Sequence, residues 1–557
     1  MKSKIFIVGV ILIFGVVLGV IITPLVSSDN VYDQFEKYKK VFGITVKNYV
    51  DDVDTQKLTE SAIRGMLNEL DPHSVYIDAK EMKDVQEDFQ GSFEGIGVQF
   101  DIINDTITII TPITGGPSDL LGIQSGDKII NIDGELAVGI DRSEVPKKLK
   151  GPSGSKVVVD IKRGNSPKLI AFTIIRDKIP LYSVDASFMF DNSDIGFVKV
   201  NRFAANTFTE LKEALAELKS KGMKKLILDL RGNPGGFLQQ AYFMANEFLK
   251  AGDTIVYTKG RRTEFDEYLI SQRTGEYSAI PLIVLVNYGS ASASEIVSGA
   301  IQDLDRGLIV GTTSFGKGLV QRQYDIGDGS AFRLTISKYY TPSGRSIQRP
   351  YKDKTDYRRL AGRLELEEGS NIEHALDKVK DAIAEENKKE LAKNPKSKNI
   401  VNLDSLPIHY TKTGRMVLGG GGVTPDFIVK GDTITNLSVD LRIERIYNEF
   451  VNNNLQNGKS IKEKYKDNFN SFKNDFKVSD QMMKDFRKLA ESKKIKWSDS
   501  DFDTDKDYIE AEIKGTIASN IWGTKERYEL FFTTVDRQIQ KALTLFPEAA
   551  KIAKSVK

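Results

Sequence analysis

The order of apolar and polar residues changes several times along the chain, and the first stretch is almost wholly apolar. Residues Ile5–Val26 carry no charge and follow Lys2 and Lys4. At about 1.5 Å per residue a helix of this length spans a bilayer, and basic residues before it stay in the cytoplasm. We therefore expect residues 1–28 to form a single-pass anchor that places the rest of the chain outside. The alternative is a removed signal peptide, although the run exceeds a usual signal core and no clean cleavage site follows.

Residues 29–90 show the spacing of amphipathic helices and form the predicted N-terminal helical segment. Apolar residues recur three and four positions apart and the pattern stops at Asp71-Pro72, where proline disfavours a continuing helix. These residues are Leu58, Ile63, Met66, Leu67 and Leu70.

From residue 91 to 178 the pattern changes to short β-like runs between glycine turns, with one short helix at about 142–149. The runs are Gly95–Phe100, Thr106–Ile110, Lys128–Ile132 and Lys156–Ile161. We expect a small β-rich domain here.

Residues 179–435 alternate between continuous apolar strands and amphipathic helices. This order is typical of an α/β layer whose sheet is buried on both faces. The predicted strands are Ile195–Val200, Lys225–Leu230 and Pro281–Val286, and the helices are Thr207–Lys221, Leu238–Leu249 and Ser292–Asp303. A charged, poorly patterned insertion is expected at about 351–412, and residues 436–557 are lysine-rich and helical in texture.

Composition narrows the class of protein. A length of 557 residues implies three or more structural units, and 40% hydrophobic with 28% charged residues is ordinary for a globular chain. The 79 basic and 77 acidic residues nearly cancel, so no nucleic-acid partner is expected. The chain has no cysteine, which excludes a cysteine nucleophile, disulfides, thiolate metal sites and a lipid-modified cysteine.

The first candidate for chemistry is Asn287–Glu295, which follows an apolar strand and opens a helix. Small residues allow a sharp turn, and a serine on the first helical turn lies beside unpaired N–H groups that can stabilise an oxyanion. The alternative is that Ser290, Ser292 and Ser294 only cap the helix and fill space.

Two further loops belong to the same α/β region. Leu228–Phe237 contains Gly232, Gly235 and Gly236, although such loops after strands also bind phosphate or simply turn. In Val310–Gln321, Lys317 stands between two glycines. A lysine buried there accepts a proton from a serine hydroxyl, whereas a solvated surface lysine does not.

The histidines distinguish between mechanisms. They are His73, His374 and His409, and none lies in these segments, so a Ser-His-Asp triad would need one to fold back. There is also no His-x-x-x-His pair or dense carboxylate cluster for a metal. Serine with lysine remains, and neither metal nor cofactor is expected.

With these residues in place, the chain resembles the carboxyl-terminal processing, or tail-specific, proteases. The shared segments occur in the order of that family, from about residue 30 to about 430. They are Leu70–Ser74, Phe93–Val98, Gly122–Asp127, Leu226–Gly236, Gly289–Glu295, Gly311–Gln321, Lys338–Gln348 and Gly422–Asp426. The resemblance implies an α/β multidomain fold: a crotonase- or ClpP-like α/β protease core over 179–435, an inserted PDZ domain over 91–178, and helical N- and C-terminal regions.

The resemblance also implies the catalytic residues. Ser292, the second serine of Gly-Ser-Ala-Ser, matches the nucleophile, Lys317 matches the general base, and Gln321 follows one helical turn later. The backbone N–H groups of Ala293 and of a loop glycine, Gly235 or Gly236, would form the oxyanion hole, and Glu295 matches a supporting carboxylate.

By the same resemblance, the PDZ loop of Gly95, Ile96, Gly97 and Val98 receives a substrate's C-terminal carboxylate. The Gln99–Ile102 strand would pair with the tail by β-augmentation. Val145 and Leu149 would line a groove for an apolar terminal side chain. The expected partners are therefore proteins or peptides with free, apolar C-termini.

Two features depart from the family or lie beyond it. Lys150 stands where the family often has arginine, which puts a PDZ-to-core contact in doubt. The region after about 436 is not covered by the resemblance. Helical flanks in the family often form oligomer contacts, which suggests a homo-oligomer.

The expected function is a serine endopeptidase of the bacterial cell envelope, on the periplasmic side, either anchored or secreted after signal cleavage. The first alternative is a catalytically silent PDZ scaffold, which would be free to lose Ser292 or Lys317. The second is a crotonase-like acyl-binding enzyme, against which a PDZ module and an exported chain both argue.

Overall fold

The computed structural model describes residues 30–349 apart from 114 and 165, ten positions scattered between 351 and 392, and residues 408–555 apart from 458 and 466. The predicted anchor, His374 and most of the predicted insertion lie outside these residues. The chain divides into two compact units, Met1–Tyr76 and Ile77–Lys557.

The described part of the first unit is helical, as the sequence predicts. Asn30 is the N-cap of helix α2 (Val31–Asn48) and Asp54 is the N-cap of α3 (Thr55–Asn68). Each of these side chains accepts a hydrogen bond from the first turn of its helix. Helix α3 ends at Asn68, before the predicted stop, because Asp71 folds the next residues into a turn by accepting bonds from His73 and Ser74. Strand β1 (Val75–Ile77) follows, so the predicted helical segment 29–90 is interrupted by a strand.

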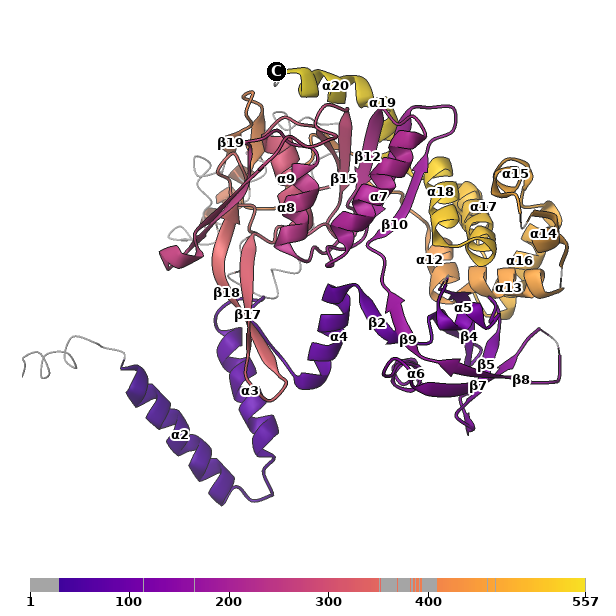
Figure 1. The fold of residues 1–557 in the computed structure, drawn as a ribbon, viewed down its shortest axis with the longest axis horizontal. Helices are drawn as coiled ribbons and strands as arrows, with labels where there is room; N and C mark the ends of the chain where they lie inside the picture. The colour runs from indigo at the N-terminus through magenta and orange to yellow at the C-terminus, as the bar shows by residue number, and fades with distance from the viewer. Residues whose placement is uncertain are drawn as a thin grey trace, which may run out of the picture. The chain divides into compact units, whose positions relative to one another are not determined.

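In the second unit, helix α4 (Ala79–Gln90) leads into the PDZ fold. Its strands are β2 (Ser92–Gly95), β3 (Val98–Ile103), β4 (Thr106–Pro112), β5 (Lys128–Ile132), β6 (Glu135–Leu136), β7 (Lys156–Lys162), β8 (Ile170–Ile175) and β9 (Asp177–Pro180), with helices α5 (Pro117–Leu120) and α6 (Val145–Leu149) (Figure 1). The main sheet has the order β3-β4-β5-β7-β8, and β2 pairs with β9. The predicted single run Gly95–Phe100 is wrong: it is split between β2 and β3, because Gly97 turns the chain at a φ of +73°.

The α/β core contains a sheet in the order β10-β11-β12-β15-β16-β21, parallel except for β10. The strands are β10 (Val184–Met189), β11 (Ile195–Val200), β12 (Lys225–Asp229), β15 (Leu282–Val286), β16 (Leu308–Gly311) and β21 (Phe427–Ile428). Helices α7 (Thr207–Ser220), α8 (Leu238–Asn246) and α9 (Ala293–Asp303) cover one face. The predicted strands and helices of this region are confirmed to within a few residues at their ends.

A second sheet and a small strand pair complete the core. Strands β13 (Thr254–Gly260), β14 (Glu267–Ile270), β17 (Leu319–Asp325) and β18 (Ala331–Tyr340) pair in an antiparallel sheet, a 3-10 turn covers Thr263–Phe265, and β19 (Ile408–Tyr410) pairs with β20 (Met416–Leu418).

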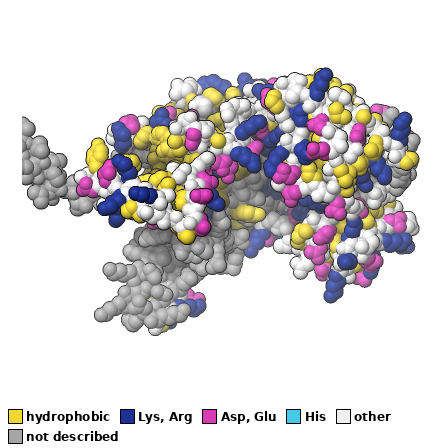
Figure 2. Space-filling model, turned by 90° about the horizontal axis from the view of Figure 1, so that it is seen from below, with side chains coloured by type: hydrophobic (Ala, Val, Ile, Leu, Met, Phe, Trp, Pro, Cys, Tyr) yellow, Lys and Arg dark blue, Asp and Glu magenta, His cyan; other side chains and the backbone are white. Residues whose placement is uncertain are grey.

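The predicted C-terminal helical region is divided between two apolar clusters. The helices are α12 (Asn436–Ile443), α13 (Ile446–Asn457), α14 (Lys459–Tyr465), α15 (Phe469–Asp475), α16 (Asp480–Ser492), α17 (Asp499–Ile521), α18 (Thr524–Thr534), α19 (Arg537–Thr544) and α20 (Phe546–Ser555). Leu441, Phe472 and Phe486 belong to a cluster of their own. Phe532 of α18 and Ile539 of α19, in contrast, pack on the second face of the core sheet. Basic and acidic side chains are interspersed over the described surface in Figure 2.

Candidate active site

A cleft of about 1220 Å³ brings together most of the predicted catalytic residues. Its walls come from α4, the β17–β18 hairpin, the glycine loop after β12 and the first turn of α9. Six predicted site residues line it: Ser292, Ala293, Lys317, Gln321, Gly235 and Gly236. Glu295 is fully buried on the next residues of α9. Three loops far apart in sequence therefore meet at one cleft, because β12, β15 and β16 are adjacent in the sheet.

The three serines after β15 have different surroundings. Ser290 is buried, and its hydroxyl donates to the Leu230 carbonyl at 2.9 Å. Ser294 is also buried, and its hydroxyl donates to the Asn233 carbonyl at 2.9 Å. Ser292 is half-buried and lines the cleft. The packing interpretation therefore holds for Ser290 and Ser294, and Ser292 is the serine that a substrate can reach.

Ser292 has an unusual backbone. It precedes α9 with φ +54° and ψ −112°, a region that costs non-glycine residues about 1–3 kcal/mol. Gly235 approaches so closely that a Cβ on it would lie 2.8 Å from the Ser292 Cβ and 2.9 Å from the Ala293 nitrogen. Glycine is required at this contact, and the turn holds the serine side chain at the start of the helix.

Glu295 joins the loops of Ser292 and Lys317. One carboxylate oxygen accepts the Ser292 and Lys317 backbone N–H groups at 2.8 and 2.9 Å. The other accepts the Ser314 hydroxyl at 2.5 Å and the Gly316 N–H at 2.6 Å. Burial raises the pKa of the Glu295 carboxyl, and these four hydrogen bonds act in the opposite direction. The carboxylate fixes the spacing of the two loops.

Lys317 is half-buried, and its ammonium donates to the Gln321 side-chain oxygen at 2.9 Å. This contact orients the lysine within the cleft. The two residues are four positions apart, but this part of the chain is not helical, because Gln321 lies on strand β17, which begins at Leu319. The two side chains nevertheless meet.

The candidate oxyanion donors are backbone N–H groups of two loops. The Gly235 N–H donates to the Asn233 side chain at 2.9 Å. In the described part of the chain, neither Gly236 nor Ala293 has a hydrogen-bond partner for its N–H. Gly236 and Ala293 are therefore the donors that the geometry leaves available to a ligand.

Tyr339 is a site residue that sequence reasoning did not single out. It is 1% exposed, and its hydroxyl contacts the carbonyl oxygens of Ser292 at 3.1 Å and of Lys317 at 2.5 Å. It bridges the same two loops as Glu295. The one available signal was its position in the Lys338–Gln348 segment, which carries no role by itself.

Comparisons with known proteins match four parts of the chain to family models. Residues 194–355 match Peptidase family S41 and residues 108–163 match the PDZ domain family. Residues 24–81 match the activating protease CtpB N-terminal domain, and residues 439–523 match a family of unknown function (DUF8443). A carboxy-terminal-processing protease of Bartonella bacilliformis is 38% identical over 352 residues, which cover 62% of this chain and 80% of that protein.

The chain belongs to the carboxy-terminal processing proteases. The carboxy-terminal processing protease CtpB of Bacillus subtilis is 36% identical over 355 residues, covering 62% of this chain and 73% of that protein. Among solved structures, a photosystem II D1 C-terminal processing protease is 28% identical, with a TM-score of 0.32, and the match covers 56% of this chain and 89% of that one.

In this carboxy-terminal processing protease, the predicted tail-binding loop lies in the PDZ fold and away from the cleft lining. Gly95, Ile96 and Gly97 are buried and Val98 is half-buried. The Ile96 carbonyl accepts both the N–H and the hydroxyl of Ser118, which fixes the loop. Strand β3 pairs with β4 alone among the described strands, so its other edge is open to a further strand.

The predicted apolar groove of the PDZ fold is wrong in its lining. Val145 is 0% and Leu149 4% exposed, and both pack in the PDZ core. Helix α6 is only five residues long, so the side chains that would have faced a groove are used to close the small core.

Lys150 makes a contact that differs from the expected one to the protease core. Its ammonium bonds Glu87 of α4 at 2.5 Å and lies 5.0 Å from the Phe93 ring centroid. The lysine therefore ties the PDZ fold to the helix that borders the cleft.

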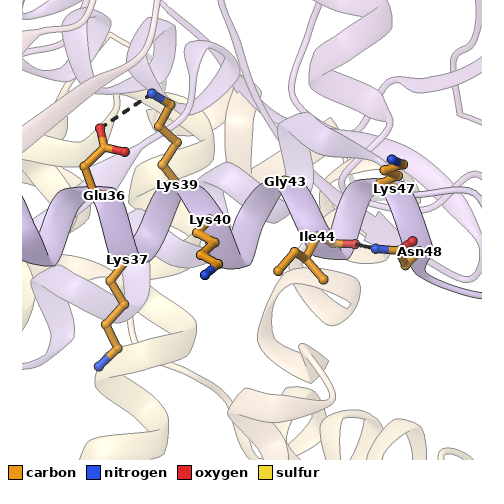
Figure 3. Close-up of a pocket in the computed structure, with 8 residues that line it drawn as sticks. All are labelled: Glu36, Lys37, Lys39, Lys40, Gly43, Ile44, Lys47 and Asn48. Atoms are coloured by element: carbon orange, nitrogen blue, oxygen red, sulfur yellow. Dashed lines mark hydrogen bonds and ion pairs between the residues drawn. The ribbon is translucent and has the colours of Figure 1, made fainter.

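Another hollow, on α2, has none of these features. All eight residues that line it come from that one helix, and their side chains project outward (Figure 3). Glu36 pairs with Lys39 at 3.5 Å, an exposed i,i+3 ion pair of little energetic value. Within the described residues, no three His, Cys, Asp or Glu side chains are grouped to hold a metal.

Proposed function

We propose that the chain is a serine endopeptidase in which Ser292 is the nucleophile and Lys317 the general base. The observation that supports this most strongly is the difference among the three serines: two hydroxyls are consumed inside the protein, and Ser292 lines the cleft with Lys317. Gln321 orients the lysine, and Glu295 holds both loops.

The proposed reaction is acyl transfer. Neutral Lys317 takes the proton of the Ser292 hydroxyl as the serine oxygen attacks the scissile carbonyl carbon. The Ala293 and Gly236 N–H groups donate to the oxyanion, where preorganised donors stabilise charge that develops in the transition state. Lys317 then gives its proton to the leaving amine. Water, deprotonated by the same lysine, hydrolyses the acyl-enzyme and restores Ser292.

Substrates are proposed to be selected by their C-terminal tails. The Gly95–Val98 loop would receive the terminal carboxylate, and the open edge of β3 would pair with the tail by β-augmentation. Proteins or peptides with free C-termini remain the proposed partners, and no cofactor, metal or nucleic acid enters the reaction.

The proposed cellular location rests on residues 1–28. We propose that residues 1–28 anchor the protein, with the protease on the periplasmic side of the cell envelope. No helix among the described residues combines the length and apolar character needed to cross a bilayer, and Ile5–Val26 lies outside those residues. A secreted form after signal cleavage remains the alternative, and a homo-oligomer is proposed through the helical flanks.

The competing function is a catalytically silent PDZ scaffold. The two are separated by incubating the purified protein, beside its Ser292→Ala form, with unfolded proteins that carry different C-terminal tails. Fragments are expected from the wild type alone, and their yield is expected to differ with the tail. Binding without cleavage would establish the scaffold, and equal cleavage by Ser292→Ala would remove Ser292 from the reaction.

A further inference from the structure

The residue that precedes the glycine loop is held by the C-terminal helices. The Arg231 guanidinium contacts both Asp536 carboxylate oxygens, at 3.0 and 2.9 Å, and the Gln538 side-chain oxygen at 2.8 Å. It also lies 5.5 Å from the Phe532 ring centroid. These three partners lie beyond residue 355, where the S41 match ends, and beyond residue 523, where the DUF8443 match ends: Phe532, Asp536 and Gln538.

This contact is part of a buried charge network. Asp229, at the end of β12, is 0% exposed and accepts two hydrogen bonds from the Arg231 guanidinium, at 3.0 and 2.7 Å. The Lys199 ammonium lies 3.3 Å from the same carboxylate. Burial alone would raise the pKa of Asp229, but Arg231 and Lys199 hold it below its usual range. Asp536 supplies a further negative charge beside Arg231, and a buried cation that loses its partner is strongly unfavourable.

Arg231 is fixed at its backbone as well as its side chain. Its N–H donates to Asp229 at 2.9 Å, and its carbonyl accepts the Lys199 ammonium. The next residue, Gly232, donates to the Asn287 side chain at 2.8 Å. The loop that continues to Gly236 therefore starts from a residue whose orientation the network sets.

The other end of the contact is equally firm. Asp536 is the N-cap of α19, and its carboxylate accepts the Ile539 N–H at 2.9 Å. Gln538 donates to the Val429 carbonyl at 2.7 Å. Ile539 is fully buried against the core sheet. Helix α19 is thus a packed part of the core and can hold Arg231 in one position.

We infer that Asp536 and Gln538 are positioning residues for the reaction: through Arg231 they set the glycine loop that carries the Gly236 oxyanion donor. The start of helix α19 is therefore part of the catalytic unit. This inference rests on the proposed function, because it gives the loop a role only if Ser292 forms an oxyanion there.

The test compares variants of the full-length protein in hydrolysis of one tail-bearing peptide. Asp536→Asn keeps an N-cap side chain of the same shape and removes the charge that faces Arg231. Gln538→Met is a milder, nearly isosteric second variant. Ser479→Ala is the control. The Ser479 hydroxyl is the N-cap of α16 and accepts the Met482 N–H, so the variant removes a helix cap that does not contact the glycine loop. Chemical unfolding is measured for each, and Ser292→Ala is assayed alongside.

A misplaced oxyanion donor reduces the stabilisation of the transition state more than it reduces the affinity for substrate. Asp536→Asn should therefore lower kcat by about tenfold or more while KM stays within about twofold. Gln538→Met should lower kcat less, and Ser479→Ala should keep kcat although it is destabilised. Wild-type kcat in both Asp536→Asn and Gln538→Met, or a loss matched by Ser479→Ala at equal destabilisation, would overturn the inference. Turnover by Ser292→Ala would instead refute the proposed function.

Discussion

At the scale of single residues, the geometry of the cleft depends on Glu295. Its two oxygens accept four hydrogen bonds from two loops, and both loops carry a residue proposed to react. Tyr339 adds a second bridge through the carbonyl oxygens of Ser292 and Lys317. Neither side chain is proposed to exchange a proton with substrate, so both act by holding the reacting groups.

Glu295→Gln tests this role. Each oxygen of Glu295 accepts two hydrogen bonds, so the NH₂ group of glutamine would face two donors and could accept from neither. Each buried donor left unpaired costs about 1–3 kcal/mol. We expect a loss of unfolding free energy of about 2 kcal/mol or more and a lower kcat. Glu276→Gln is the control, because Glu276 forms an exposed pair with Lys219 and should change neither quantity. Wild-type stability and turnover in Glu295→Gln would show that Glu295 does not hold the loops of Ser292 and Lys317 together.

Lys317→Arg should be nearly inactive in a peptide hydrolysis assay, because arginine stays protonated and cannot accept the serine proton. Lys338→Arg, at an exposed position of β18, should retain wild-type activity. Wild-type activity should rise with pH, since only the neutral lysine is a base. Chelators should have no effect, and inhibition that added metal reverses would contradict the serine–lysine mechanism.

At the scale of elements, the sequence predicted the strands and helices of the α/β core closely. Continuous apolar strands such as Leu282–Val286 and the amphipathic spacing of α7 are strong local signals. The PDZ region was less predictable. Gly97 interrupts an apolar run that looks like one strand, and α6 is too short to present a groove.

The site residues that stand in distinctive local segments were predictable from the sequence, and those that depend on long-range contacts were not. Ser292 and Lys317 stand in distinctive local segments, whereas the role of Tyr339 arises from a contact across 47 positions of sequence with Ser292. The engagement of the Gly235 N–H by Asn233 could not be foreseen either. Which amide of a glycine loop is free depends on φ and ψ, which glycine leaves open.

The β3 edge and its preceding loop give a prediction about tails. A peptide with a free C-terminal carboxylate should bind the Ser292→Ala protein more tightly than the same peptide with an amidated end, because amidation removes the negative charge. Affinity is measured by titration of the matched pair, with a peptide of charged terminal residue as a third ligand. Equal affinity for acid and amide would show that the Gly95–Val98 loop does not read the carboxylate.

At the scale of the whole molecule, the second face of the core sheet is covered by the end of the chain. Ile227, Ile283 and Val310 pack against residues of α18–α20. The sequence indicated that the strands are buried on both faces, but not which helices cover the second one. That pairing joins segments more than 200 positions apart and leaves no local pattern.

The N-terminal segment gives a prediction for the intact protein. Full-length protein should fractionate with membranes and retain residues 1–28 when its intact mass is measured. A form without residues 1–28 should be soluble and should cleave soluble substrates at the wild-type rate. A mature N-terminus that begins after residue 28 would replace the anchor with a cleaved signal peptide.

The central claim is that Ser292 is the nucleophile, and the turnover of three single variants on one tail-bearing substrate tests it most directly. Ser290→Ala removes two hydrogen bonds, one donated to the Leu230 carbonyl and one accepted from the Asn287 N–H, and Ser294→Ala removes one. At a cost of about 1 kcal/mol of stability for each bond, both variants should keep substantial turnover. Ser292→Ala should fold like the wild type and have no turnover. Wild-type turnover in Ser292→Ala, with loss of turnover in Ser290→Ala, would contradict the assignment.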